Sequence, residues 1–188
     1  LGTSAGTDEA THLVDSTIEK SPVTDKYAEL FSYNETLHTY KFKKEVTGDQ
    51  VAAKNDPELS ETWRRAQRYN GKGCLNAVDN VEKHLAPLFE GKTIAEVGTM
   101  VDVDRQMLEL ERKVAIERGK LNESAPAEEQ ITIMQRKANL GMNAILSASL
   151  ALGRLIAARE GVELPNILEA LEGKIDRETE RLLAIERY

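Results

Sequence analysis

The longest apolar segment of the chain begins with the stretch LGMNAILSASLA, residues 140–151, and continues to Glu160. Asn143 belongs to the residue types favoured at helix N-caps, so we predict a helix from Asn143 to Glu160. Small and apolar residues lie on almost every side of this helix. Because a helix that is apolar nearly all round suits the interior, we expect it to be the central element.

Helical patterns lie on both sides of this segment. Asp56-Pro57 supplies an N-cap and a first-turn proline, and Thr93 with Glu96 forms a capping box. Asp102 or Asp104 is the expected cap of a longer helix. The predicted helices cover residues 57–69, 75 to about 87, a short stretch after 93, a stretch through 107–114, 127–137, 165–171 and a charged helix at 175–188.

Strand patterns are few. Residues 9–15 alternate weakly, residues 37–46 alternate like a half-exposed strand, and a short helix is expected at 25–31. Aromatic residues make up 5% of the chain and charged residues 30%, a balance typical of helical packing. We therefore predict an α+β, predominantly helical fold, with a small antiparallel β element packed on a helical bundle.

Composition excludes several classes of protein. The net charge of -7 disfavours general binding to nucleic acid or to an anionic membrane surface. Residues 144–158 are too short and too polar to span a bilayer. A single cysteine, Cys74, allows no internal disulfide, and no signal peptide is recognisable, so we expect a cytoplasmic location with no nucleic-acid or membrane partner.

Common catalytic and metal-binding patterns are not found in the sequence. His12, His38 and His84 are far apart, with no metal-ligand spacing around them. Cys74 follows Lys72, which favours a thiolate, but with no histidine adjacent in sequence we interpret Cys74 as a packing residue.

One helix combines basic and aromatic residues. Arg64, Arg65 and Arg68 lie close to Trp63 and Tyr69, which is one pattern of a nucleic-acid surface. Acidic residues in the same helix and the acidity of the whole chain favour a solvated helix face instead.

Three separated stretches together resemble a known family. Residues 2–10, GTSAGTDEA, are similar to the pattern Gly-Ala-Ser-Thr-Gly-x-x-Glu-Ala, which precedes a strand ending in Arg-Asp. Residues 71–81, GKGCLNAVDNV, resemble Gly-Lys-Gly-Val-x-x-Ala-Val-x-x-Val, and LGMNAILSASLA resembles Leu-Gly-Ala-Asn-Ala-Ile-Leu-Gly-Val-Ser-Leu-Ala. The family is enolase, the phosphopyruvate hydratase of glycolysis, and the matching part is its N-terminal capping domain.

The sequence also departs from this family. Val14 stands where the family has arginine, Ala5 where it has threonine, and Leu1 where it has serine. Insertion-like segments run from about 16 to 70 and from about 111 to 136. The resemblance implies an enolase N-terminal-like domain over residues 1–172, followed by the charged terminal helix at 173–188.

In enolases the chemistry belongs to a barrel, which supplies the magnesium-binding carboxylates, a lysine base and a glutamate acid. This chain has no room for such a barrel, so we assign no catalytic residue. We expect no magnesium-dependent dehydration of 2-phosphoglycerate to phosphoenolpyruvate from this chain alone. The partners that the resemblance implies are an enolase-type barrel domain or further copies in a homo-oligomer.

The resemblance implies that the N-terminal loop is the part of the family's site present in this chain. The resemblance implies a lid formed by Gly2, Thr3, Ser4 and Gly6, with Ser4 as a magnesium ligand conditional on a barrel partner. The alternative is a flexible tail. The alternative function is a non-enzymatic helical module for protein interaction or oligomerisation, using residues 16–70 and the terminal helix.

Overall fold

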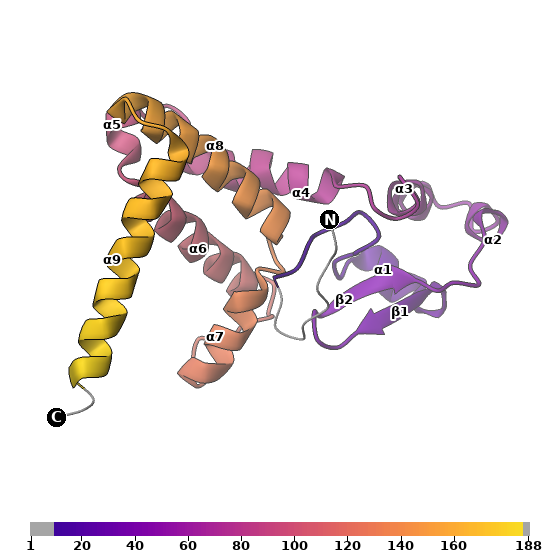
Figure 1. The fold of residues 1–188 in the computed structure, drawn as a ribbon. Helices are drawn as coiled ribbons and strands as arrows, with labels where there is room; N and C mark the ends of the chain where they lie inside the picture. The colour runs from indigo at the N-terminus through magenta and orange to yellow at the C-terminus, as the bar shows by residue number, and fades with distance from the viewer. Residues whose placement is uncertain (1–9, 186–188) are drawn as a thin grey trace.

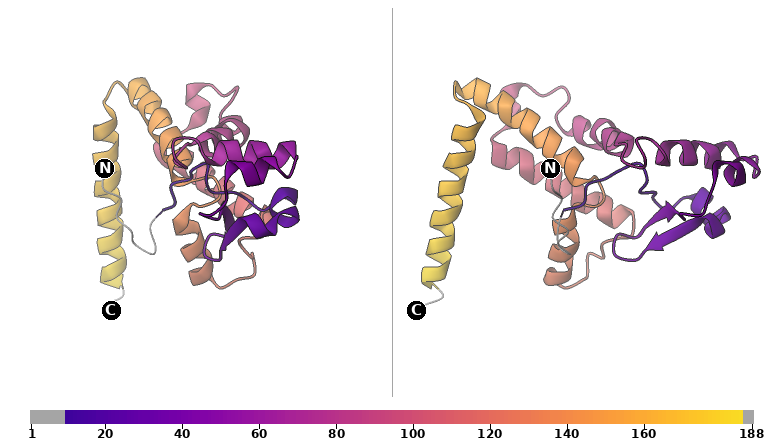
Figure 2. Two further views of the ribbon diagram at one scale, coloured as in Figure 1. Left: turned by 90° about the vertical axis from the view of Figure 1, so that its right-hand side faces the viewer. Right: turned by 45° about the vertical axis from the view of Figure 1, so that its right-hand side comes forward.

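The computed structural model describes residues 10–185, with side chains described as far as residue 174 (Figure 1). An N-terminal part, residues 10–70, holds a two-stranded sheet and short helices, and a larger helical body follows it. Figure 2 shows the N-terminal part and the last helix at opposite ends of this body. The predicted α+β, predominantly helical fold with a small antiparallel sheet is confirmed.

The body contains six α-helices among the described residues. They are α4 (Leu75–Asn80), α5 (Ile94–Val97), α6 (Met100–Glu117), α7 (Ala127–Arg136), α8 (Met142–Glu160) and α9 (Leu164–Ile185). A π-helical turn, Val81–Leu85, and a 3-10 turn, Ala86–Leu88, extend α4.

Helix α8 is the centre of the body, as its composition predicted. It contacts α4 with its π-helical extension, α5, α6 and α9. Its buried residues Ala144, Ile145 and Ile156 join a core with Val103 and Met107 of α6. Burial is nevertheless one-sided, because Leu146 and Leu155 on α8 are each about half exposed.

The N-terminal part has a core of its own. Its elements are α1 (Pro22–Lys26), a 3-10 turn at Ala28–Leu30, β1 (Phe31–Asn34), β2 (Thr39–Phe42), α2 (Gly48–Ala52) and α3 (Pro57–Ala66). The strands are antiparallel, with Phe31 opposite Phe42. The Phe31 and Phe42 rings lie 4.5 Å apart, and Trp63 of α3 packs edge-on against Phe42 at 4.9 Å. The insertion-like segment therefore folds around a separate aromatic and aliphatic cluster.

Several predicted helix boundaries are confirmed. Asp56 caps α3, with Pro57 in its first turn, and Thr93 with Glu96 forms the capping box of α5. Helix α7 covers almost all of the predicted residues 127–137. No helix in the described part of the chain has the length and apolar character needed to cross a membrane.

Other predictions were wrong in detail. Residues 10–14 belong to no strand, because their backbone groups bond to the end of α7 and the start of α8. The strand expected at 37–46 is confined to β2, and Phe31 begins β1 rather than ending a helix. The helices expected at 165–171 and 175–188 are one helix, α9.

Two expected caps were also assigned to the wrong residues. Thr99 caps α6, and Asp102 is its capping-box partner three residues later. Gly141, at φ 92°, precedes α8, so Asn143 lies inside the helix and its side chain is free for another role.

A buried glutamate holds the loop between α7 and α8. Glu111 of α6 is fully buried, and its carboxylate oxygens accept hydrogen bonds from the backbone N–H groups of Asn139 and Leu140, at 3.0 and 2.7 Å. The side-chain amide of Asn139 donates a third at 2.9 Å. Asn80 completes the arrangement, since its amide donates to the carbonyl oxygen of Leu140 at 2.8 Å.

We predict that Glu111→Ala lowers the free energy of unfolding by roughly 3–5 kcal/mol, because three buried donors lose their acceptor. Urea denaturation followed by circular dichroism measures this change. Glu109→Ala, at an exposed position of the same helix, is the matched control and should change stability by less than about 0.5 kcal/mol. Equal effects of the two substitutions would contradict the role given to Glu111.

Candidate functional site

Two of the enolase-like stretches, residues 71–81 and 140–151, contact the same segment of the chain. The residues that follow the first stretch, 11–19, run between the helical body and the N-terminal part; we call them the seam segment. The segment passes the other two stretches at residues 71–76 and 140–143. Two stretches that are far apart in sequence therefore meet at this segment.

The third stretch holds the first half of the seam segment. Asn143 binds the backbone of Leu13 twice, accepting from its N–H at 2.9 Å and donating to its carbonyl oxygen at 3.0 Å. The N–H of Met142 donates to the carbonyl oxygen of Thr11 at 2.8 Å. A Cβ atom at Gly141 would meet the Leu13 side chain. A glycine is therefore required where the seam segment crosses the start of α8.

The second stretch holds the middle of the seam segment through Asp15. The Asp15 carboxylate is fully buried and accepts from the N–H of Asn76 at 2.9 Å and from the Arg68 guanidinium at 3.2 Å. The N–H of Asp15 donates to the carbonyl oxygen of Gly73 at 2.7 Å. A Cβ atom on Gly73 would overlap the Asp15 carboxylate. The close approach explains the second glycine of the Gly-Lys-Gly motif.

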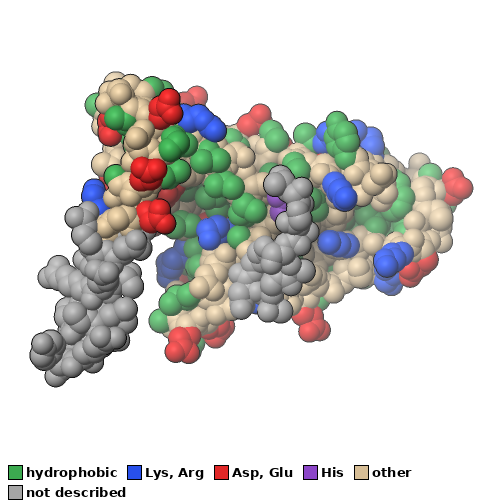
Figure 3. All heavy atoms as spheres, in the orientation of Figure 1, with side chains coloured by type: hydrophobic (Ala, Val, Ile, Leu, Met, Phe, Trp, Pro, Cys, Tyr) green, Lys and Arg blue, Asp and Glu red, His purple; other side chains and the backbone are tan. Residues whose placement is uncertain are grey.

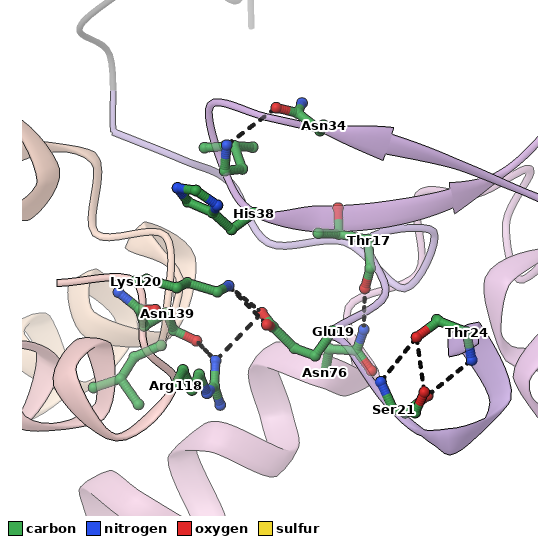
Figure 4. Close-up of polar contacts among 12 residues, drawn as sticks. Thr17, Glu19, Ser21, Thr24, Asn34, His38, Asn76, Arg118, Lys120 and Asn139 are labelled. Carbon is green, nitrogen blue, oxygen red and sulfur yellow. Dashed lines mark hydrogen bonds and ion pairs between the residues drawn. The ribbon is translucent and has the colours of Figure 1, made fainter. Parts of the chain in front are cut away.

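The end of the seam segment forms an ion-pair cluster with the loop after α6. Glu19 binds Lys120 at 2.7 Å and Arg118 at 3.4 Å (Figure 4). Arg118 also donates to the carbonyl oxygen of Asn139 at 2.6 Å, in the loop held by Glu111. Burial lowers the pKa of the Lys120 ammonium group, and the nearby Glu19 carboxylate opposes that shift.

Two polar cavities flank the seam segment. One, of about 340 Å³, lies between the segment and α3 and α4, and the Arg65–Asp79 ion pair lines it. The other, of about 450 Å³, lies beside the β-hairpin and is lined by Glu19, Lys120 and His38 among others. The charged side chains that line these cavities form ion pairs, such as Arg65 with Asp79 and Glu19 with Lys120. We therefore interpret the site as an anchor for the N-terminal loop rather than a reaction centre.

The predicted lid residues Gly2, Thr3, Ser4 and Gly6 lie outside the described residues 10–185. The structure describes the residues that follow this loop, beginning at residue 10. Among the described residues, no group of three or more His, Cys, Asp and Glu side chains is arranged to hold a metal ion. The described part of the chain does not by itself fit magnesium.

The contacts of the remaining candidate residues indicate their roles. His12 and Cys74, distant in sequence, come together with Nε2 and Sγ 3.8 Å apart, so Cys74 does have a histidine neighbour. Arg64 pairs with Glu61 on its own helix. The other two arginines of the basic helix bind Asp79 and Asp15, which favours the structural interpretation over a nucleic-acid surface.

Sequence reasoning missed the residues that do most of the anchoring. Glu111 and Asp15 were not singled out, because carboxylates on helices and at turns usually face solvent. Asn143 was noticed, but as a helix cap. The only feature of the sequence that pointed to Asn143 was its place within an enolase-like motif. Such a motif indicates that the position matters but does not show which residue Asn143 contacts.

Comparison with known proteins shows that the chain is similar to enolases. The chain is 40% identical over 107 residues to enolase of Eimeria tenella, covering 56% of this chain and 20% of that enolase. Enolase of Mastigamoeba balamuthi is 35% identical over 106 residues, covering 56% of this chain and 19% of the relative. This chain is related to enolase over about half of its length.

The relationship extends across distant organisms. Enolase of the archaeon Methanopyrus kandleri is 35% identical over 97 residues, covering 52% of this chain and 17% of the relative. The chain thus spans about a fifth of the length of the curated enolases it matches. No protein-family profile matches the sequence, and no solved structure matches it significantly. The extent of the match is consistent with an enolase N-terminal domain.

We predict that Asn143→Ala releases the first half of the seam segment, because it removes both hydrogen bonds to Leu13. Hydrogen exchange of the amides from Thr11 to Asp15 should accelerate by roughly ten- to a hundredfold, as expected for a loss of about 1–3 kcal/mol. Asn143→Asp keeps the acceptor and should give a smaller effect. Asn122→Ala, in an exposed turn, is the control. Unchanged exchange in Asn143→Ala would refute the anchor.

We predict that Lys120 makes stability rise with pH in the alkaline range. Its folded-state pKa lies below the unfolded value of about 10.4, so the unfolded chain binds more protons between the two values. The free energy of unfolding should rise with pH there. Lys120→Met should reduce this slope, measured by thermal unfolding in a pH series, whereas Lys113→Met at an exposed position should leave it unchanged. Equal slopes for wild type and Lys120→Met would contradict the prediction.

Proposed function

We propose that this chain acts as an enolase-type capping domain, related to the magnesium-dependent dehydration of 2-phosphoglycerate to phosphoenolpyruvate. One observation carries the proposal. Two enolase-like stretches, residues 71–81 and 140–151, meet at the seam segment, where Asn143 and Asp15 fix the chain next to the third, the glycine loop. Motifs that merely packed a helical bundle would have no need to converge on one extended strand of backbone.

A lid needs a loop that can close and a base that stays fixed. The contacts of the seam segment supply the fixed base next to the glycine loop. Two glycines, Gly2 and Gly6, flank Ser4 in the sequence, and glycine allows the backbone changes that closure requires. We assign Ser4 the role of an oxygen ligand to a magnesium ion held by the carboxylates of a barrel domain. That role depends on the barrel partner, and no catalytic acid or base is assigned to this chain.

We predict that this chain alone does not dehydrate 2-phosphoglycerate, and that it binds an enolase-type barrel expressed without its own N-terminal domain. Co-elution in size-exclusion chromatography measures binding. Phosphoenolpyruvate absorbance, with and without magnesium, measures activity. The chain together with the barrel should show activity that neither shows separately. Activity of the chain alone, or failure to bind the barrel, would overturn the capping role.

Ser4→Ala tests the lid within the same assay. It should bind the barrel as well as wild type but lose at least about a hundredfold in activity, because a positioned ligand is missing. Thr7→Ala, in the same loop, is the matched control and should retain activity. Full activity in Ser4→Ala would reject the ligand role and leave the capping role standing.

A second candidate function is a non-enzymatic interaction or oligomerisation module. It is favoured by an apolar groove on the helical body, lined by residues of α6, α7 and α9, that the enolase-like stretches do not explain. The two functions are compatible, because they use different surfaces of the chain.

A further inference from the structure

The polar cavity between the seam segment, α3 and α4 has features that an anchor does not require. We call it the α3–α4 cavity, and its lining includes Arg65, Asp79, Lys83, His84 and Arg118. Its volume of about 340 Å³ lies at the lower end of the range for small-molecule sites. The Lys83 side chain is 68% exposed, so the cavity opens to solvent on that side.

One buried hydrogen-bond donor of the cavity lining lacks an acceptor. The Nη2 atom of Arg65 donates to Asp79 at 2.6 Å, whereas its Nε–H is buried and has no hydrogen-bond partner among the described residues. A buried donor without an acceptor is costly, and in a folded protein it calls for a specific explanation. An oxygen atom of a bound anion would satisfy this donor.

Positive charge exceeds negative charge around the cavity. Asp79 is shared by Arg65 and Lys83, at 2.6 and 3.8 Å, and Glu19 is likewise shared by two cations (Figure 4). The surplus of two positive charges, in a chain whose net charge is -7, favours an anion with two negative charges. The charged residues of the lining and their direct ion-pair partners are five cations and three carboxylates: Arg65, Arg68, Lys83, Arg118, Lys120, Asp15, Glu19 and Asp79.

Charge is unevenly distributed over the surface of the chain. On the face seen in Figure 3, Lys and Arg side chains lie over α3 and the neighbouring N-terminal part, whereas Asp and Glu side chains gather where α8 meets α9. Basic side chains that surround one cavity create a local field that attracts anions. The acidity of the whole chain still disfavours a large polyanion, so a small anion fits the cavity better.

An unusual helical turn forms part of the cavity wall. The π-helical turn Val81–Leu85 extends α4 and provides Lys83 and His84 to the lining. Such turns are rare and occur frequently at functional sites. His84 is half-buried, and its imidazole ring has a hydrogen-bond donor in either tautomer. The turn therefore supplies donors from a second element, beside those of Arg65 on α3.

The cavity combines the two parts of the chain. Arg65 belongs to the insertion-like segment, residues 16–70, whereas Asp79 belongs to the second enolase-like stretch, residues 71–81. The cavity is therefore not a feature of the enolase-like stretches alone. A ligand bound in it would contact both parts and hold α3 against α4.

We propose that the α3–α4 cavity binds a phosphate dianion, as free phosphate or as the phosphate group of a small metabolite. A phosphate group carries close to two negative charges at neutral pH and offers several strong acceptor oxygens. Guanidinium groups match its geometry and donate charge-assisted hydrogen bonds to it. The Arg65 Nε–H and the Arg118 guanidinium are the main donors, and the π-helical turn provides further ones. The inference goes beyond the capping role, because this binding involves neither a barrel nor the glycine loop.

The test uses the full chain without any barrel. Isothermal titration calorimetry measures the binding of inorganic phosphate and of glycerol phosphate, with sodium chloride at equal ionic strength as the control. At least one of the two phosphates should bind with a Kd of about 1 mM or lower, as a few charge-assisted hydrogen bonds allow. Tighter binding of glycerol phosphate would identify a phosphorylated metabolite as the ligand, and tighter binding of inorganic phosphate would identify free phosphate. Succinate, a dianion without a phosphate group, should bind at least about tenfold more weakly.

Substitutions on α3 test the assigned donor. Arg65→Gln removes a cation and the unpaired Nε–H, and should weaken phosphate binding by at least about tenfold. Arg65→Lys keeps the charge but loses the Nε–H, and should give a smaller loss. Arg64→Gln, at the preceding and exposed position of the same helix, is the matched control and should bind phosphate like wild type. Lys83→Gln, at an exposed position that folding does not require, should also weaken binding. Circular dichroism checks that each variant is folded.

Histidine signals report where phosphate binds. In a phosphate titration at constant pH followed by NMR, the imidazole signals of His84 should move, because His84 lines the cavity. Those of His38, which lines the cavity beside the β-hairpin, should stay in place. The proposal would be overturned by any of four results: no phosphate binding, equal affinities of Arg65→Gln and Arg64→Gln, signals that move at His38 and not at His84, or succinate binding as tightly as phosphate.

Discussion

The buried carboxylate of Glu111 is the contact on which the rest of the arrangement depends. It accepts three hydrogen bonds from Asn139 and Leu140, and so fixes the loop between α7 and α8 in the interior of the body. Once that loop is fixed, Gly141 and Asn143 are placed to receive the backbone of Leu13. A group buried without a hydrogen-bonding partner is costly, so the glutamate and the loop hold one another in place.

The chain combines an enolase-like helical body with a small unit inserted between the first and second enolase-like stretches. The insertion has its own core around Phe31, Phe42 and Trp63, so it can be accommodated without disturbing the packing of α8. The polar contacts of Glu19 with Arg118 and Lys120 then join the two parts. Because the two parts have separate cores, the enolase-like motifs pack together although their spacing in the sequence is unusual.

Two surfaces of the chain suit different partners. The seam segment is held by hydrogen bonds to Asn143, Asn76 and Arg68, which suits a fixed base for the N-terminal loop. The groove lined by α6, α7 and α9 is apolar, which suits a partner with an apolar surface.

The sequence by itself determined the helical class, most helix boundaries and the relationship to enolase. These features depend on local periodicity, on caps such as Asp56 and Thr93, and on short motifs, all of which are readable within a few residues. Only the tertiary structure decided that Asn143 binds Leu13 rather than capping α8, that Glu111 is buried, and that residues 10–14 join no strand. Each of these depends on a partner between 28 and 130 residues away in sequence, and the pattern of a single segment contains no information about a partner at that distance.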